Sequence, residues 1–331
     1  MRRTVRCSPS FFCLFWGLLE KKCVSLHRHF CVCIMWYRFY AIVFALLMTV
    51  SGLKAQRTSQ LEVFCGAELN YRDINFLRLY DVLLRATPGV KYHFGDDWMV
   101  AAQAYVPIWN EGYGMRGNML RLNMADISKE VHFTNARQYF KFSAGLFGSE
   151  RYGADVRWAF PVNSWLLFHA RLGYTGHWSL GYHFDGYSES ELTGDDWALS
   201  GIGGASVWLS PWNTEFRASG GRYINKDYGV EGEVVRHFNH CSISAFVQKH
   251  ESYKSTGGTN DYSGGFRVVM MLPPYKKHSD KAVVFRPASN FRLTYNAQSN
   301  GFSMKQYNTD PEENERTQPI RIPWGTGNFN E

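Results

Sequence analysis

The chain has 331 residues, of which 45% are hydrophobic, 20% are charged and 16% are aromatic, so its composition excludes a disordered or fibrous protein. The formal net charge of +7 is confined to residues 1–55, which hold eight Lys and Arg against one acid, and the charges of the remaining chain cancel. That balance argues against a nucleic-acid partner, which would need a basic surface.

The first predicted element is a cleavable signal peptide over residues 35–55. An apolar core from Ala41 to Val50 follows a charged residue, and small residues lead to a cleavage position at Ala55. The core is shorter than the roughly 17–25 residues that a membrane-spanning helix needs. We therefore expect Met35 to be the true start, with residues 1–34 upstream of it. A retained membrane anchor is the weaker alternative.

The barrel region is predicted over residues 56–274, where segments of about ten residues alternate in polarity. In one segment Leu166, Phe168 and Leu172 share a face, and His169 and Arg171 share the other. The predicted strands cover roughly residues 61–70, 87–94, 98–107, 117–126, 137–147, 153–161, 165–175, 197–209, 213–223, 228–238, 241–250 and 263–273.

Strand length and aromatic placement favour a membrane barrel over a soluble sandwich. Tilted membrane strands need about 9–11 residues, whereas strands of soluble proteins usually have about 5–6. Tryptophans recur near the segment ends, as in interfacial girdles. The fold class predicted is all-β, an antiparallel transmembrane β-barrel of about 12 strands (10–14), with an even count expected for a bacterial outer-membrane protein. A secreted β-sandwich is the alternative.

Residues 275–331 form a polar C-terminal tail, which we expect to be exposed or disordered, although a tail that occludes the barrel is also open. Two cysteines follow the signal peptide, Cys65 and Cys241, and the sequence neither requires nor excludes a disulfide between them. Strand parity predicts a set of charged and polar side chains that face the lumen: Lys141, His169, Arg171, Glu215, Arg217, Glu233 and Arg267.

Three stretches resemble the YjbH-type family of outer-membrane proteins tied to exopolysaccharide production. They run from Phe142 to Trp158, from Gly221 to Asn239 and from Gly264 to Pro273. The residues that match the family motifs are Gly145, Tyr152, Gly153, Arg222, Tyr223, Asp227, Gly229, Arg236 and Phe238. Family members are typically much longer, so the chain is similar to their C-terminal barrel alone. The resemblance implies an outer-membrane barrel and supplies no catalytic set.

The function predicted is a porin-like outer-membrane barrel of a Gram-negative envelope that acts in exopolysaccharide or capsule production or export, as a passive pore or an assembly component. Outer-membrane lipid is the expected partner, with polysaccharide and periplasmic export proteins as further candidates and no nucleic acid. The alternative functions are those of a secreted adhesin-type β-sandwich and, after it, of an envelope-modifying enzyme. Neither a Gly-x-Ser-x-Gly nor a His-Glu-x-x-His pattern occurs, so no catalytic residue, metal ligand or cofactor is predicted.

Overall fold

A computed structural model describes most of the chain after residue 58. The described residues are 59–74, 81–95, 97–182, 188–251, 262–273, 282–289, 291–298, 306–314, 320, 322 and 324, and the side chains of 188–196 are not described. Residues 1–56 form one unit and residues 57–331 another. The expected signal peptide, its apolar core and the upstream residues 1–34 therefore lie outside the described residues.

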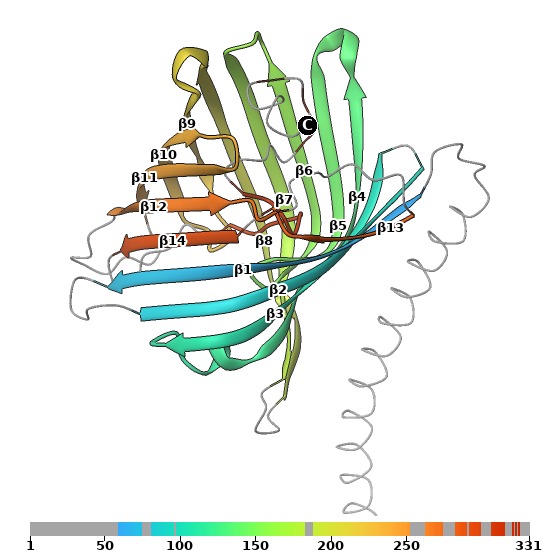
Figure 1. Ribbon diagram of the computed structural model, residues 1–331, viewed down its shortest axis with the longest axis vertical. Helices are drawn as coiled ribbons and strands as arrows, with labels where there is room; N and C mark the ends of the chain where they lie inside the picture. The colour runs from blue at the N-terminus through green and yellow to red at the C-terminus, as the bar shows by residue number, and fades with distance from the viewer. Residues whose placement is uncertain are drawn as a thin grey trace, which may run out of the picture. The chain divides into compact units, whose positions relative to one another are not determined.

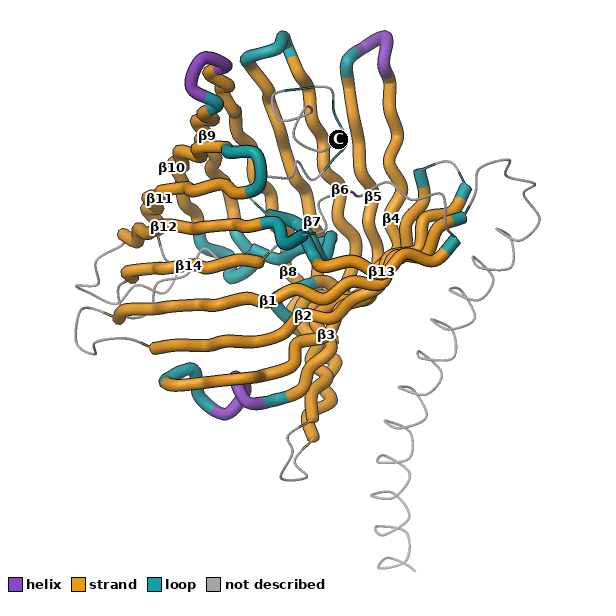
Figure 2. Tube along the Cα trace, in the orientation of Figure 1, coloured by secondary structure: helices purple, strands orange, loops and turns teal. Residues whose placement is uncertain are grey.

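The described part of the second unit is built mainly of strands (Figures 1 and 2). The strands are β1 (Gln60–Ile74), β2 (Asp81–Phe94), β3 (Trp98–Glu111), β4 (Leu120–Phe133), β5 (Gln138–Phe147), β6 (Arg151–Pro161), β7 (Leu166–Tyr182), β8 (Ser188–Leu209), β9 (Thr214–Arg222), β10 (Tyr228–His237), β11 (Cys241–Glu251), β12 (Tyr262–Met270), β13 (Val283–Pro287) and β14 (Phe291–Gln298). Three short 3₁₀ turns are η1 (Met115–Asn118), η2 (Thr134–Ala136) and η3 (Ser210–Trp212). Among the described residues, no helix is both long and apolar enough to cross a membrane.

The sheet closes into a barrel of 13 strands with a radius of 14 Å. Strands β1 to β12 pair in sequence order and antiparallel, β12 pairs with β14, and β14 returns to β1. Figure 1 shows this order as a run of colour from blue β1 through green β5 to orange β12. A closed sheet leaves no long unpaired edge that could recruit another chain.

The closure differs from the even, fully antiparallel barrel that the sequence led us to expect. An odd number of antiparallel strands brings the first and last strand together in the same direction, and β1 indeed pairs with β14 in parallel. The short β13 pairs with the first part of β1, also in parallel, and β14 covers the rest. Both β13 and β14 follow residue 274, so the barrel extends beyond the boundary expected from the change in composition.

The outer face of the barrel is apolar, because the residues with outward parity are mostly large hydrophobic side chains. Exposed examples occur on nine strands: Val90, Ile108, Phe142, Phe168, Leu199, Phe216, Val234, Val247 and Phe266. A sandwich would bury its apolar faces between two sheets. The single closed sheet with its apolar outer face therefore contradicts the sandwich alternative.

Five of the tryptophans fall into two groups. Trp98, Trp109 and Trp212 lie at strand ends or in turns, as expected of interfacial positions. Trp178 and Trp208 are instead buried, and the Trp178 indole donates a hydrogen bond to the Arg151 carbonyl at 2.7 Å. For these two, the expected girdle position is wrong, because their side chains fill the protein interior.

Candidate functional site

The C-terminal segment is packed against the inner wall of the barrel. Tyr307, Thr309, Glu312 and Asn314 are buried, as are the hydrophobic residues Ile320 and Trp324. The strand residues that contact this segment come from β2, β3, β5, β6, β7, β8 and β13. We call residues 306–314 with Ile320, Ile322 and Trp324 the plug. The expectation of an exposed or disordered tail is wrong for most of these residues, which are buried or half-buried inside the barrel.

Two lysines of the wall hold the first plug carboxylates. The Lys91 ammonium lies 2.7 Å from an oxygen of Asp310 and 2.9 Å from an oxygen of Glu312. Lys141, whose side chain is only 3% exposed, lies 3.6 Å from the other oxygen of Asp310. Lys91 sits between the exposed Val90 and Tyr92 in the sequence of β2, so strand alternation directs it inward.

Two arginines hold the remaining plug carboxylates. Arg157 donates two parallel hydrogen bonds to Glu313, at 2.7 and 2.8 Å. Arg286 of β13 binds Glu312 through both terminal nitrogens, each at 2.6 Å, and also pairs with Glu62. Such two-pronged guanidinium–carboxylate pairs fix orientation as well as charge.

Neutral groups also bind the plug. The Gln103 amide donates to the Pro311 carbonyl at 3.1 Å, and the Ser289 backbone N–H donates to Glu312 at 2.8 Å. The Gly148 N–H donates to the Asn308 carbonyl at 3.0 Å. The plug is therefore held along its length by side chains and backbone of several strands and turns.

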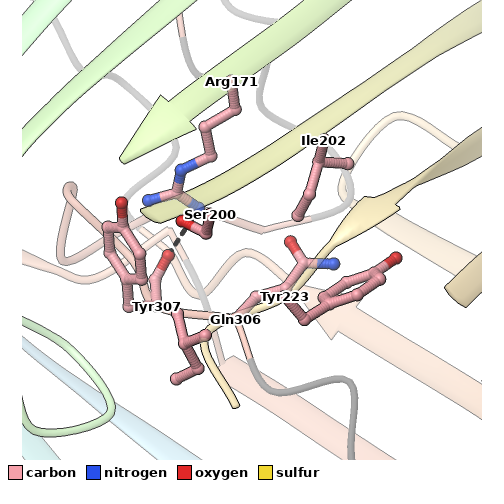
Figure 3. Close-up of a pocket in the computed structure, with 7 residues that line it drawn as sticks. Arg171, Ser200, Ile202, Tyr223, Gln306 and Tyr307 are labelled. Atoms are coloured by element: carbon pink, nitrogen blue, oxygen red, sulfur yellow. Dashed lines mark hydrogen bonds between the residues drawn. The ribbon is translucent and has the colours of Figure 1, made fainter. Parts of the chain in front are cut away.

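Tyr307 anchors the start of the plug (Figure 3). Its ring stacks on Phe147 with the centroids 5.3 Å apart, and its hydroxyl donates to Asp155 at 2.8 Å. The Arg171 guanidinium lies 3.9 Å from the ring centroid and donates to the Tyr307 carbonyl at 2.7 Å. Gly173 makes room for this ring, because a Cβ there would lie 1.7 Å from the Tyr307 hydroxyl.

The far end of the plug is apolar. Ile320 and Trp324 form one buried cluster with Tyr139, Leu167 and Trp208 of the wall. Its burial removes apolar surface from water, worth about 25 cal/mol per Å². Polar and apolar contacts thus divide along the segment, with ion pairs at residues 310–313 and hydrophobic packing at 320–324.

Burial and the neighbouring wall residues shift the pKa values of the plug side chains. Burial opposes ionisation of Asp310, yet Lys91 and Lys141 hold the pKa of its carboxyl well below the ordinary value. Burial likewise opposes ionisation of Glu312, and Lys91 and Arg286 lower its pKa. Burial raises the pKa of the Tyr307 hydroxyl to about 12. Both carboxylates and the neutral phenol are therefore the forms present near neutral pH.

The seven residues named from parity fall into two sets by their contacts. Lys141 and Arg171 contact the plug, and His169 lines a cavity beside it. The other four form one row across β9, β10 and β12. In this row Arg217 binds Glu215 at 2.7 and 2.8 Å, and Arg267 binds Glu233 at 2.7 Å. The buried His237 extends the row, with its Nε2 at 3.3 Å from Glu215.

Sequence reasoning missed the residues that face the plug from other strands, namely Lys91, Arg157 and Arg286. It also missed the plug carboxylates Asp310, Glu312 and Glu313. A pattern was present, since the acid-rich stretch at 310–313 follows a barrel with several inward-facing basic residues. Opposite charges of this kind pair when both are withdrawn from water.

Two of the family-motif glycines allow neighbouring strands to approach closely. Gly145 and Gly153 are paired across β5 and β6, with φ values of 142° and 147°. A Cβ would lie 2.5 Å from the Ala125 carbonyl oxygen at Gly145 and 2.2 Å from that of Tyr174 at Gly153. The motif therefore marks a backbone contact that only glycine permits.

The second motif forms the turn between β9 and β10. The Tyr223 N–H donates to the Asp227 carbonyl at 2.8 Å, and both residues are buried. The next residue, Ile224, packs with Phe147 and Tyr307 in a second apolar cluster. This turn thus contacts the residue that anchors the plug through Ile224, and Figure 3 shows Tyr223 lining the same small pocket as Arg171 and Tyr307.

The other motif residues lie nearer the surface or within strands. Tyr152 packs edge-on against Trp197, with the ring centroids 5.0 Å apart. Arg236 donates to Thr214 at 3.2 Å and lies 5.8 Å from the ring centroid of Phe238. Gly229 is paired with His250, and Arg222 with Tyr228. These residues are not gathered into one site.

Among the residues that the structure describes, two cavities can be placed between wall and plug. The smaller, about 10 Å³, is lined by Arg171, Ser200, Tyr223 and Tyr307 and has the size of one water molecule (Figure 3). The larger is about 220 Å³ and lies between the inner faces of β6 to β10 and the plug. Within the described residues no group of three or more His, Cys, Asp or Glu is placed to hold a metal ion, and Cys65 and Cys241 are free thiols.

Comparison with known protein families, curated proteins and solved structures finds no match. What is shown is therefore the architecture: a large closed barrel of 13 strands, consistent with an outer-membrane barrel, whose lumen holds its own C-terminal segment.

Proposed function

We propose that this protein is an outer-membrane barrel of a Gram-negative envelope that takes part in exopolysaccharide or capsule production or export, as a pore or an assembly component closed by its plug. The observation that carries the membrane location is the apolar outer face of a closed sheet whose interior is charged. Exposed apolar patches on soluble monomers rarely exceed a few hundred Å². An apolar face carried by most of the strands fits lipid as its solvent.

The glycan role is supported by the motif resemblance and by the polar lumen. The resembling stretches include the turn at Tyr223 and the strands around Gly153, which surround the Tyr307 anchor. A barrel of 13 strands is wider than the eight-stranded barrels that side chains alone can fill. The plug occupies this space, so passage of a polymer requires the plug to move.

The partners that we propose are outer-membrane lipid, a polysaccharide and periplasmic export proteins, with no nucleic acid, because the charges after residue 55 cancel. We also propose a non-enzymatic role, since the sequence offers no recognised nucleophile–base pattern. Delivery through a cleavable signal peptide at residues 35–55 is part of the proposal.

The membrane location is tested by fractionation and by gel migration before and after boiling. The protein should stay with the outer membrane after a salt wash and should migrate differently once boiled. Release by salt would contradict it. N-terminal sequencing of the purified protein tests the signal peptide, and recovery of peptides from residues 1–34 would overturn that part.

The glycan role is tested by deleting the gene in its native host and quantifying surface and secreted polysaccharide. We expect loss of one polymer, restored by the wild-type gene. An unchanged polysaccharide profile under conditions in which the polymer is made would overturn the role in export while leaving the barrel itself untouched.

A further inference from the structure

The larger cavity is bounded on one side by the wall and on the other by the plug. The wall supplies His169, Arg217 and Ser219, and the plug supplies Gln306 and Asn314. These side chains come from separate strands and from a segment more than eighty residues later in the chain. The cavity therefore exists only while the plug is seated.

The volume suits one small ring. In the liquid one water molecule takes up about 30 Å³, so 220 Å³ corresponds to roughly seven water molecules. A hexose displaces the volume of about six water molecules and fits this space, whereas a disaccharide displaces about twelve and does not.

The lining combines hydrogen-bonding groups with an apolar floor. Ser219, Gln306 and Asn314 offer neutral donors and acceptors, while Leu167 and Ile320 offer an apolar surface. Sugars present the same combination, hydroxyl groups around the edge of a ring and C–H groups on its faces. Small-molecule sites in general pair an apolar lining with a few placed polar groups.

Two arginines of the lining are already paired with carboxylates. Arg217 is held by Glu215 in a two-pronged pair, and Arg157 is held in the same way by Glu313 of the plug. An anionic ligand would have to compete with these carboxylates for the same guanidinium groups. An uncharged ligand binds without breaking either pair.

We propose that this cavity binds a single uncharged sugar ring. The inference deepens the proposed function and rests on it, because it names the kind of group that the lumen recognises. Since plug residues complete the cavity, a bound sugar favours the seated plug. A free monosaccharide and the terminal unit of a polymer share this chemistry.

The test uses the full-length protein in a detergent without a sugar headgroup. Glucose, galactose and N-acetylglucosamine are titrated up to high millimolar concentration and followed by calorimetry or ligand-observed NMR, with glucuronate and acetate as anionic comparisons. We expect saturable binding of at least one neutral sugar and slower proteolysis of the C-terminal segment in its presence. A short oligosaccharide with the same terminal unit tells the two sources apart.

Two variants locate the site. Ser219→Leu fills the cavity without removing a charge and should weaken binding about tenfold or more, about 1.4 kcal/mol. Thr294→Leu places the same side chain on the inner wall at β14, away from the cavity, and should leave binding unchanged. Boiling-dependent gel migration confirms that both variants form the barrel.

Absence of saturable binding by all three neutral sugars would overturn the inference, as would binding of glucuronate or acetate alone, or equal loss in both variants. Each of these results concerns the cavity only. Failure of the proposed function instead shows as an unchanged polysaccharide profile on gene deletion, whatever the binding result.

Discussion

The substitution Asp310→Asn tests whether ion pairs hold the plug in the barrel. The amide has almost the same shape as the carboxylate, and its oxygen can still accept the hydrogen bond that the Glu312 N–H donates to Asp310 at 2.9 Å. The change therefore removes charge and little else. Two lysines lose a partner: Lys91 at 2.7 Å and Lys141 at 3.6 Å.

The structure sets the size of the effect. Removing one partner of a fully buried ion pair costs about 3–5 kcal/mol. Asp310 is 20% exposed, and Lys91 keeps Glu312 as a second partner, so we expect about 2–3 kcal/mol here. Since about 1.4 kcal/mol is a factor of ten, the ratio of open to plugged barrels should rise about 30- to 150-fold.

Single-channel recording in planar bilayers at about 0.1 M salt measures this ratio as open probability, at an ionic strength that leaves partly buried pairs effective. The matched control is Glu251→Gln, which neutralises an exposed carboxylate at the end of β11. The wild type and the control should stay mostly closed, while Asp310→Asn opens often.

Equal open probabilities in all three proteins, with the barrel shown intact by gel migration, would refute the reasoning. They would mean that hydrophobic packing at residues 320–324 holds the plug, and that the ion pairs only position it.

Three further predictions concern the same elements. Gly173→Ala should displace the Tyr307 ring and make the C-terminal segment sensitive to protease, whereas Gly203→Ala, whose added Cβ meets nothing within 4 Å, should not; equal cleavage of both would contradict the fit. The wall lowers the carboxyl pKa values of Asp310 and Glu312 from the ordinary 3.8 and 4.5, so the plug is fully stabilised above these ordinary values and loses stability as the pH falls below them. The open probability should therefore be flat from pH 8 to 5 and rise below about pH 4. Phe168→Arg should impair membrane assembly by about 2–4 kcal/mol, measured as the yield of heat-modifiable barrel, while Ser164→Arg in an exposed turn should assemble normally.

Local sequence was enough to predict the approximate positions of β1 to β12. In β7 Phe168 and Leu172 are exposed on the outer face, and Arg171 turns inward to Asp155, as parity predicts. A strand has a period of two, so any stretch with one apolar and one polar face carries this information within a few residues. The same reasoning placed the charged row on β9, β10 and β12 inside the barrel.

Closure and the plug were decided only by tertiary structure. The local sequence pattern does not determine that the strand number is odd or that β14 pairs with β1 in parallel, because this pairing joins residues more than two hundred positions apart. The plug is a more extreme case, since its sequence is polar and short of strand pattern, which by itself favours an exposed tail. Asp310 and Glu312 are buried next to Lys91 of the distant β2 and Arg286 of β13, which bind their carboxylates. Tyr307 is buried where Gly173 leaves room for its ring. Sequence determined which strand faces are polar, and the folded barrel determined what fills the polar interior, because only folding brings Lys91 and Arg286 next to the plug carboxylates.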